Sequence, residues 1–338
     1  MFGTDCPVIR TGEDEPKPGE FHLAVRDVIS HCIYGVDLNP LAVDLCKVAL
    51  WLEGHWAGKP LSFLDHRIRC GNSLIGVLDP KVLEDGIPDG AFTAVTGDDK
   101  KAAAYFKKRN KQERTSRQRG LTFEADDHSG EYAATNRELR DLAENTAADV
   151  RKKAQMYSGW RAGMEHSHDE AVADLWTGQF FLPLTSTTDP VVCTTKDFLE
   201  FAVDKRKKPQ QVAAAQAIAQ QIRFFHWHLE FPEIFQGGGF DVLLGNPPWE
   251  RVQVAEEDHW ADDPYVAAAR NKSERHSRID EYRNSADPAK CARVARFELE
   301  KHISDAEGKF FKRGSRFPLS ASGDTNTYAL FTELGRAY

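Results

Sequence analysis

The sequence predicts an α/β fold in which a sheet of parallel strands is interrupted by large helical insertions. Three short apolar stretches, at residues 33–37, 66–70 and 240–244, are each followed by polar residues, as strands that end at the edge of a sheet are. A helical pattern follows the first stretch directly, which is the order of elements in parallel α/β sheets. The segments between the other stretches are charged and rich in alanine, which favours helices.

The first half-sheet is predicted from the order helix, strand, helix. Residues 21–30 form the first helix, which leads into the strand Ile33–Asp37. Asn39 is a suitable N-cap and Pro40 a suitable first-turn residue for the next helix, Leu41–Glu53, after which Gly54 is a stop signal. Apolar residues at helical spacing predict the face of this helix that turns to the core: Leu41, Leu45, Val48, Ala49 and Leu52.

A third strand, His66–Cys70, leads into the loop that begins at Gly71. Residues 79–230 then form an insertion too long for a loop, and helical periods at 131–175 and 207–226 predict a helical subdomain. Its expected anchors are apolar: Leu175, Trp176, Phe180, Phe181 and Leu182. A second charged helical stretch spans about 251–312, and a further helix begins near residue 324.

The most informative segment follows the apolar run Phe240–Leu244, which predicts a buried strand. Next come Gly245 and Asn246-Pro247-Pro248-Trp249, and two consecutive prolines can continue neither a strand ladder nor a helix interior. The chain must therefore leave the sheet in a stiff, extended loop. Two acceptors, the side-chain oxygen of Asn246 and the carbonyl of Pro247, beside the flat ring of Trp249 match an exocyclic amino group on a base held out of its duplex.

Polar residues also follow the other two strands. Asp37 ends the first strand, where α/β sheets place a carboxylate on the ribose hydroxyls of a cofactor. Asn72 lies just beyond the third. Each has a simpler interpretation: Asp37 as a cap or surface acid, and Asn72 as a turn residue. Three polar strand ends in this order favour the functional interpretation.

These motifs together resemble the N6-adenine-specific DNA methyltransferases of the gamma type. More narrowly, the chain resembles the large methylases that are fused to, or partnered with, restriction and phage-defence systems. It is carried by IYGVDLNPLAVDLCKVALWLEG, CGNSL, FHWHLEFPEIF, FDVLLGNPPWERV and GDTNTYALF. It covers most of the chain, with weaker support between residues 80 and 205.

The resemblance implies a Rossmann-like class I methyltransferase sheet and S-adenosylmethionine as the methyl donor. Asp37 would bind the ribose of this cofactor, and Asn72 stands where the family has a polar residue facing the cofactor's adenine. Asn246 and Pro247 would accept hydrogen bonds from the N6 amino group of an adenine flipped out of double-stranded DNA. Trp249 would stack on that base, and Pro248 would complete the motif.

The chain departs from the family pattern at its beginning, because nothing before Asp37 matches the usual strand and glycine-rich cofactor loop. It also stops inside an apparent helix at Tyr338. We therefore expect an incomplete sheet of about three to four strands, weak binding of S-adenosylmethionine, and no activity from the chain alone. A missing N-terminal part, a restriction subunit or a specificity domain would then be a partner.

The expected organisation has three parts. Residues 1–78 form a partial cofactor-binding half of the methyltransferase domain, residues 79–230 the helical insertion, and residues 231–338 the catalytic half with Asn-Pro-Pro-Trp, truncated at its C-terminus.

Composition favours a soluble, cytoplasmic protein, without a signal peptide or an apolar run that approaches a membrane span. The formal net charge of −8 excludes uniform attraction to nucleic acid, so DNA binding would need local basic patches. Basic residues crowd positions 100–119 around Tyr105 and Phe106. This stretch predicts either phosphate contacts or an ordinary solvated helix.

Other candidate sites have weaker support. The six cysteines include no Cys-x-x-Cys pair, which argues against a zinc site or a disulfide framework. Histidines at 226–228 and 166–168 have the spacing of metal ligands, but packing and solvation explain them better. Glu15-Pro16-Lys17 has the Glu-x-Lys spacing of a nuclease, yet it lies in a proline-containing loop without a strand.

Two alternative functions stay open at this point. Some enzymes with a related Asn-Pro-Pro-aromatic motif methylate glutamine side chains of proteins. Those enzymes are small and usually carry Tyr at the aromatic position. The chain could also be the non-catalytic half of a split protein.

Overall fold

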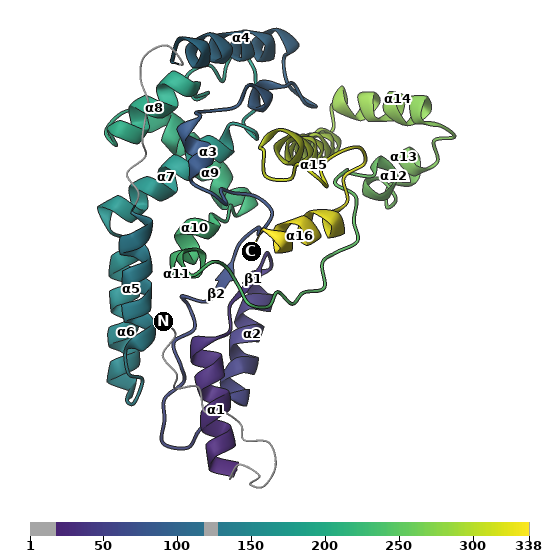
Figure 1. Cartoon of the computed structure of the whole chain (residues 1–338). Helices are drawn as coiled ribbons and strands as arrows, with labels where there is room; N and C mark the ends of the chain where they lie inside the picture. The colour runs from purple at the N-terminus through teal and green to yellow at the C-terminus, as the bar shows by residue number, and fades with distance from the viewer. Residues whose placement is uncertain (1–17, 118–127, 338) are drawn as a thin grey trace. The chain divides into compact units, whose positions relative to one another are not determined.

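A computed structural model describes residues 18–117 and 128–337. Glu15-Pro16-Lys17 and the last two residues of the basic stretch at 100–119 lie outside these residues. Figure 1 shows the helices and strands along the chain. The chain divides into two compact units. Unit 1 comprises residues up to Cys70 together with Arg137–Trp160, and unit 2 comprises Gly71–Asn136 and the residues from Arg161 onward.

The described residues are mostly helical, with one small parallel sheet, which is compatible with the predicted α/β class. The two strands are β1 (Gly35–Asp37) and β2 (Ile68–Cys70). The helices are α1 (Pro18–His31), α2 (Pro40–Glu53), α3 (Lys81–Glu84), the 3-10 turn η1 (Asp89–Phe92), α4 (Lys100–Arg117), α5 (Ser129–Asp141), α6 (Ala147–Arg161), α7 (Met164–Gly178), α8 (Thr195–Val203), α9 (Pro209–Ile222), α10 (Trp227–Glu230), α11 (Pro232–Gln236), α12 (Glu256–His259), α13 (Pro264–Ala267), α14 (Lys272–Arg283), α15 (Pro288–Arg313) and α16 (Thr327–Arg336).

None of these helices combines the length and the apolar character that a membrane crossing requires.

Unit 1 is built on the two parallel strands. Gly35 pairs with Ile68 and Asp37 with Cys70. The predicted start of α2 is confirmed, because the Asn39 side chain accepts a hydrogen bond from the amide of Leu41 and Pro40 opens the helix. The predicted strands at 33–37 and 66–70 are thus confirmed in part, each shortened to its last three residues.

The predicted core face of α2 is wrong. Its residues Leu41, Leu45 and Leu52 are 75%, 69% and 73% exposed. The helix instead turns Val43 into a core with Ile29, Leu64 and Ile68, against which Leu50 and Trp51 are partly buried. Since α2 is apolar on both faces, its periodicity indicates a helix but does not indicate which face meets the core.

A second apolar cluster completes unit 1. Phe63, Leu139 and Tyr157 are buried together, so the segment after α2 is joined to the α6 region. His66 lies in the same environment, with its ring stacked on Phe63 at a centroid distance of 5.3 Å.

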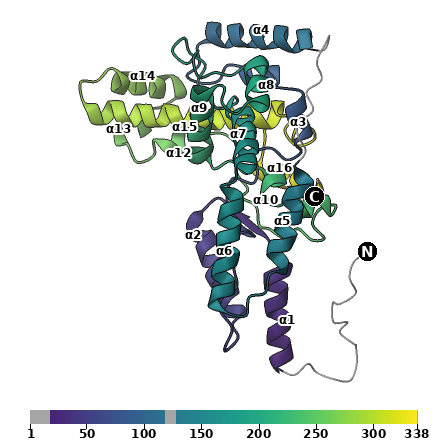
Figure 2. The same ribbon diagram turned by 90° about the vertical axis from the view of Figure 1, so that its left-hand side faces the viewer.

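Unit 2 has a helical core, and α7 and α9 lie side by side in both views (Figures 1 and 2). The predicted anchors Leu175, Trp176 and Phe180–Leu182 are all buried, which confirms their role. Trp176 and Phe180 meet Phe310 of α15, with ring centroids 6.4 Å and 5.2 Å away. The indole of Trp176 also donates a hydrogen bond to the carbonyl of Gly86 at 3.0 Å.

The helices after the Asn-Pro-Pro-Trp segment share a small core of their own. Trp260, Val266, Ile279, Tyr282, Val294 and Phe297 form one buried cluster. This cluster joins α13, α14 and the first half of α15, as the predicted helical stretch at 251–312 requires.

The predicted buried strand at Phe240–Leu244 is wrong. Residues 240–244 form no strand, and Val242, Leu243 and Leu244 are 78%, 53% and 95% exposed. The expected sheet of three to four strands is wrong as well, because the sheet within the described residues has two. An apolar run indicates a tendency to be buried, but a strand forms only where another strand completes its hydrogen bonds.

Candidate functional site

The first predicted site residue, Asp37, ends β1 in unit 1 and is exposed. Its carboxylate accepts a hydrogen bond from the amide of Asn39 at 2.7 Å, which fixes the side chain beside the start of α2. Burial raises the pKa of the nearby Cys46 thiol, and the negative charge of Asp37 raises it further. An exposed carboxylate at the carboxyl end of a parallel strand is a suitable acceptor for hydroxyl groups.

Asn72 belongs to unit 2, and its side chain stabilises a turn. Its Oδ1 accepts a hydrogen bond from the amide of Leu74 at 3.2 Å. The backbone runs parallel to the segment after α9: the amide of Asn72 donates to Arg223 at 2.6 Å, and the amide of Phe225 donates to Ile75 at 2.8 Å. The structure therefore supports a turn role for Asn72, while the predicted cofactor role stays a prediction.

Two glycines allow this close approach of the loop to Phe225. A Cβ on Gly76 would lie 2.2 Å from the carbonyl oxygen of Phe225, and the φ of Gly76 is +141°. A Cβ on Gly71 would lie 2.5 Å from the Phe225 ring. A side chain would clash at either position, and Gly71 belongs to the Cys-Gly-Asn-Ser-Leu motif, so this motif reflects a packing requirement as well as a polar site.

The same loop is held by side chains from distant parts of the sequence. The guanidinium of Arg316 donates to the carbonyls of Gly76 at 2.9 Å and Ser73 at 2.8 Å. The indole of Trp227 donates to Ser73 at 2.9 Å. The role of Arg316 was not predicted from the sequence, because no local pattern marks a contact between residues more than 200 positions apart.

The Asn-Pro-Pro-Trp segment lies on the surface of unit 2. Asn246, Pro248 and Trp249 are exposed, Trp249 by 80%, and Pro247 is half-buried. The outward orientation expected of a stiff double-proline loop is therefore present, although the strand expected before it is not.

The segment is fixed on its C-terminal side by the start of α16. The hydroxyl of Thr327 donates to the carbonyl of Pro248 and accepts from the amide of Glu250 at 3.1 Å. The amide of Thr327 donates back to the carbonyl of Glu250 at 3.0 Å, in an antiparallel bridge between Arg251 and Asn326. Thr327 thus holds the chain immediately after the two prolines.

Tyr328 adds a second ring beside Trp249. The two ring centroids are 5.6 Å apart with an interplanar angle of 37°, and Tyr328 is 47% exposed. Sequence analysis assigned no role to Thr327 or Tyr328. The signal that could have identified them is the Gly-Asp-Thr-Asn-Thr-Tyr stretch, which contributes to the family resemblance.

The structure brings some of the predicted residues into one unit. Asn72, Asn246, Pro247, Pro248 and Trp249 belong to unit 2. Asp37 belongs to unit 1. Each residue is placed within its own unit, and the functional role of each stays a prediction.

The histidine motifs have structural partners. Nδ1 of His226 accepts a hydrogen bond from the amide of Val77 at 3.0 Å, and Nε2 lies 3.0 Å from Oδ1 of Asp174. On α7, Asp169 lies 2.9 Å from Nδ1 of His128 and accepts from the hydroxyl of Tyr132 at 2.7 Å. Within residues 18–117 and 128–337, no three His, Cys, Asp or Glu side chains are grouped to hold a metal ion.

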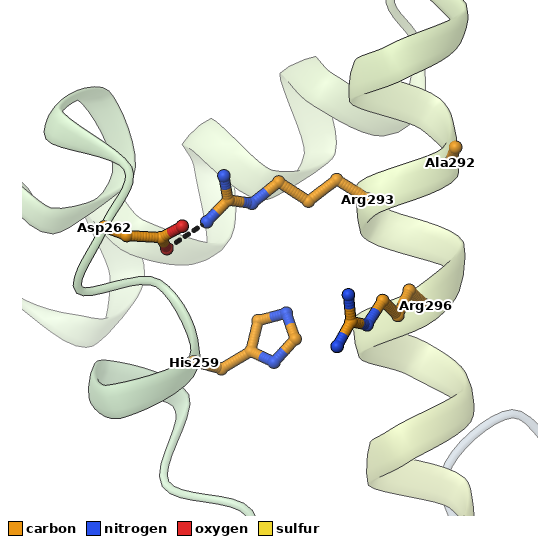
Figure 3. A pocket seen from close by; sticks show the side chains of 5 residues that line it. All are labelled: His259, Asp262, Ala292, Arg293 and Arg296. Atoms are coloured by element: carbon orange, nitrogen blue, oxygen red, sulfur yellow. Dashed lines mark hydrogen bonds and ion pairs between the residues drawn. The ribbon is translucent and has the colours of Figure 1, made fainter.

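One open hollow of about 390 Å³ lies beside α15 and is lined by His259, Asp262, Ala292, Arg293 and Arg296 (Figure 3). Its cations are paired: Arg293 with Asp262, and Arg296 with Glu300 at 2.9 Å. The Arg296 hydrogen bond lowers the pKa of Glu300. We assign no ligand to this hollow, since its charges are satisfied by one another.

Comparisons with known proteins find similarity to restriction-modification methylases. Residues 31–284 match the family model described as Eco57I restriction-modification methylase. A putative type II restriction enzyme and methyltransferase from Methanocaldococcus jannaschii is 22% identical over 238 residues, which cover 66% of this chain. The chain spans only 18% of the length of that relative. No solved structure matches.

The matched residues include Asp37, Asn72 and the whole Asn-Pro-Pro-Trp segment. The chain belongs to the Eco57I restriction-modification methylase family.

Proposed function

We propose that this chain carries the target-base site of an S-adenosylmethionine-dependent DNA methyltransferase that acts on N6 of adenine, within a restriction-modification or phage-defence system. The observation that carries the proposal is the exposed segment Asn246–Trp249, fixed by Thr327 and flanked by Tyr328. The family and the printed name of the M. jannaschii relative favour DNA over protein glutamine as the substrate.

The residues of the segment suit an amino group attached to an aromatic ring. The side-chain oxygen of Asn246 and the carbonyl of Pro247 would each accept one of the two N6 hydrogens of adenine. Trp249 would cover one face of the flipped base, and base–aromatic stacking is worth ~1–3 kcal/mol. Thymine and guanine present a carbonyl where adenine has its N6 amino group, so they match the two acceptors less well.

The described residues also fit part of the cofactor. Asp37 is an exposed carboxylate at the end of a parallel strand, which suits the ribose hydroxyls of S-adenosylmethionine. When bound, this cofactor supplies an electrophilic methyl group. Asn72 could offer its side-chain nitrogen, because its oxygen is engaged by the amide of Leu74.

The reaction requires the chain to position the target amino group, and it does not require a nucleophilic side chain. The lone pair of the N6 nitrogen is delocalised into the ring, so the amino group is a poor nucleophile. Two acceptors at Asn246 and Pro247 favour a pyramidal nitrogen and localise the lone pair. The nitrogen would form its bond to the methyl carbon while the bond between that carbon and the sulfur of the donor breaks, and it would afterwards lose a proton to solvent. Preorganised acceptors of this kind stabilise the transition state by electrostatics and orientation.

The test measures methylated nucleosides in the DNA of cells that make this chain together with the missing N-terminal part expected from the family pattern, in a host without other adenine methylation. Mass spectrometry of the digested DNA should find N6-methyladenine. Asn246→Ala should reduce it by about 10²- to 10³-fold, as the loss of one preorganised polar group does. Asn246→Asp keeps an acceptor at the same position and should retain more methylation than Asn246→Ala.

Gln253→Ala is the matched control, because it removes an exposed amide a few residues beyond the motif. It should leave the level of N6-methyladenine unchanged. Normal methylation by Asn246→Ala would overturn the assignment of the motif. Methylated cytosine, or methylated glutamine in place of methylated DNA, would overturn the proposed substrate.

A further inference from the structure

Helix α4 has two faces of different character. It spans Lys100–Arg117, and its sequence has eight basic residues but one acid, Glu113. One face is buried: Ala103, Phe106 and Asn110 are 3%, 1% and 0% exposed.

Asn110 holds this inner face against other parts of unit 2 by four hydrogen bonds. Its Nδ2 donates to the carbonyl of Ile87 at 2.8 Å and to Asp89 at 2.7 Å. Its Oδ1 accepts from the amide of Thr195 at 2.9 Å and from the Thr195 hydroxyl at 2.8 Å. All four bonds involve groups of the same unit, so α4 is held in a fixed position and is not a loosely attached charged segment.

Two arginines of α4, Arg109 and Arg114, form ion pairs within the protein. Arg109 pairs with Asp197 at 2.9 Å and with Glu113 at 3.0 Å. Arg114 lies 3.9 Å from Asp89. These cations are therefore largely neutralised by neighbouring carboxylates.

The lysines of α4 form a separate, exposed row, which we call the lysine face: Lys100, Lys101, Lys107, Lys108 and Lys111. At 3.6 residues per turn, these five positions fall within about a third of the helix circumference and extend over about 17 Å. Among residues 18–117 and 128–337, none of the five forms an ion pair. Their charges are available to a ligand.

The lysine face has the chemistry of a contact for a phosphate backbone. A length of 17 Å along a DNA duplex carries about ten phosphate charges. Ala104 and Thr115 lie between the lysines, and the large apolar side chain Phe106 points inward. A helix that lies on a membrane would expose its apolar face, whereas α4 buries it. Because the chain has a net charge of −8, local attraction to DNA must come from such a surface.

We propose that the lysine face of α4 binds the phosphate backbone of double-stranded DNA and holds the duplex independently of its sequence. This inference rests on the proposed function, since it assigns to the DNA substrate a second contact surface away from the target base. Backbone contacts of this kind position a protein on DNA and carry no base specificity.

The experiment compares two variants of the full chain with equal charge. The first carries Lys101→Gln, Lys107→Gln, Lys108→Gln and Lys111→Gln. The second, the control, carries Lys→Gln at four other exposed positions of unit 2: Lys81, Lys205, Lys207 and Lys312. Glutamine is a good helix former, so α4 should persist. Circular dichroism and thermal unfolding should be unchanged in both variants.

Binding to a labelled 30-base-pair duplex is measured by fluorescence anisotropy at several salt concentrations. Each lost phosphate contact lowers the slope of log K against log salt by about 0.9. With four lysines removed, the α4 variant should reduce the slope by up to about 3.6 and the affinity at 0.1 M salt by at least about tenfold. The control should keep both values near those of the wild type.

Equal effects of the two variants, or an α4 variant that binds like the wild type, would overturn the inference. So would a wild-type chain that does not bind the duplex. These outcomes are separable from the proposed function, which is read from N6-methyladenine in cells. If that base is present while the α4 variant binds normally, only the role of α4 fails. If the α4 effect occurs and the base is absent, only the methylation fails.

Discussion

At the scale of single residues, the exposure of Trp249 follows from its neighbours. Pro247 and Pro248 cannot donate to a strand or a helix, so the chain between them and Glu250 stays extended. Thr327 then fixes the carbonyl of Pro248 and the amide of Glu250. An aromatic ring that is 80% exposed is not a core residue, which is why we propose that Trp249 stacks on the target base.

His66 gives a residue-scale prediction about pH. Burial lowers the pKa of His66 to about 2, with the neighbouring charge of Arg67 as the next cause. The unfolded state therefore binds a proton below its pKa of about 6.5, while the folded state does not. The free energy of unfolding should fall as the pH decreases from 6.5, by up to about 1.4 kcal/mol per pH unit.

His66→Gln should remove this contribution and flatten the pH dependence between about pH 6.5 and 4. Glutamine can still accept the hydrogen bond that Nε of Arg67 donates to His66 at 3.0 Å. Urea unfolding at several pH values measures the slope. His55→Gln is the control at an exposed position and should leave the slope unchanged. A His66→Gln slope equal to that of the wild type would mean that His66 does not remain neutral in the folded protein.

At the scale of elements, short loops do more than the strands to define the candidate site. The loop Gly71–Val77 runs beside the segment that follows α9, and it is clamped by Arg316 and Trp227. The Asn-Pro-Pro-Trp loop is clamped by the first residue of α16. In both loops the fixing groups come from distant parts of the sequence.

Gly76 offers an element-scale test of the first loop. Gly76→Ala places a Cβ 2.2 Å from the carbonyl of Phe225 at a φ of +141°, so both clash and strain oppose it. Gly238→Ala is the matched control in the same unit, with a φ of +97° and nothing within 4 Å of the added Cβ. The control should lose about 1–2 kcal/mol. Gly76→Ala should lose more than about 4 kcal/mol, as measured by urea unfolding. Similar losses would show that the contact with Phe225 is not tight.

Thr327 offers the corresponding test of the second loop. Thr327→Val keeps the shape of the side chain but removes the hydrogen bonds of its hydroxyl with Pro248 and Glu250, so the motif should lose its fixed position. Cellular N6-methyladenine should fall by about tenfold or more, since small displacements of positioning groups are costly. Thr327→Ser should restore it.

Thr332→Val is the control for that change. It alters the same helix at an exposed hydroxyl that bonds only the carbonyl of Tyr328 in the previous turn. Its methylation should equal that of the wild type. If Thr327→Val also methylates normally, the hydroxyl of Thr327 is not needed to position the motif.

At the scale of the whole molecule, the sequence predicts those features that depend on residues close to one another in the chain. Asn39 and Pro40 start a helix through hydrogen bonds and backbone geometry of their own segment, and this prediction is confirmed. The apolar anchors of α7 are also confirmed, because Leu175 and Trp176 stand in a dense apolar run.

Features that depend on a distant partner were not predictable in the same way. Leu41 and Val43 are both apolar residues of α2, and only the position of the core decides which one is buried. Residues 240–244 have strand composition, but within the part of the chain that the structure describes no strand pairs with them. Arg316 is one of many arginines until the fold brings it to Gly76 and Ser73.

We propose that the loop at Asn246–Trp249 receives an unpaired adenine, and a comparison of two duplexes separates this role from a purely structural one. One duplex carries adenine opposite an abasic site, and the other carries thymine there, so either base leaves the stack at little cost. Fluorescence anisotropy gives the two affinities, and their ratio cancels the sequence-independent contacts to the backbone. We predict that the wild type prefers the unpaired adenine. Trp249→Phe should keep the affinity for the adenine duplex, and Trp249→Ala should lower it by ~1–3 kcal/mol, or about 5- to 150-fold. Equal affinity of the wild type for the two duplexes, or undiminished binding of the adenine duplex by Trp249→Ala, would mean that the loop does not receive the adenine.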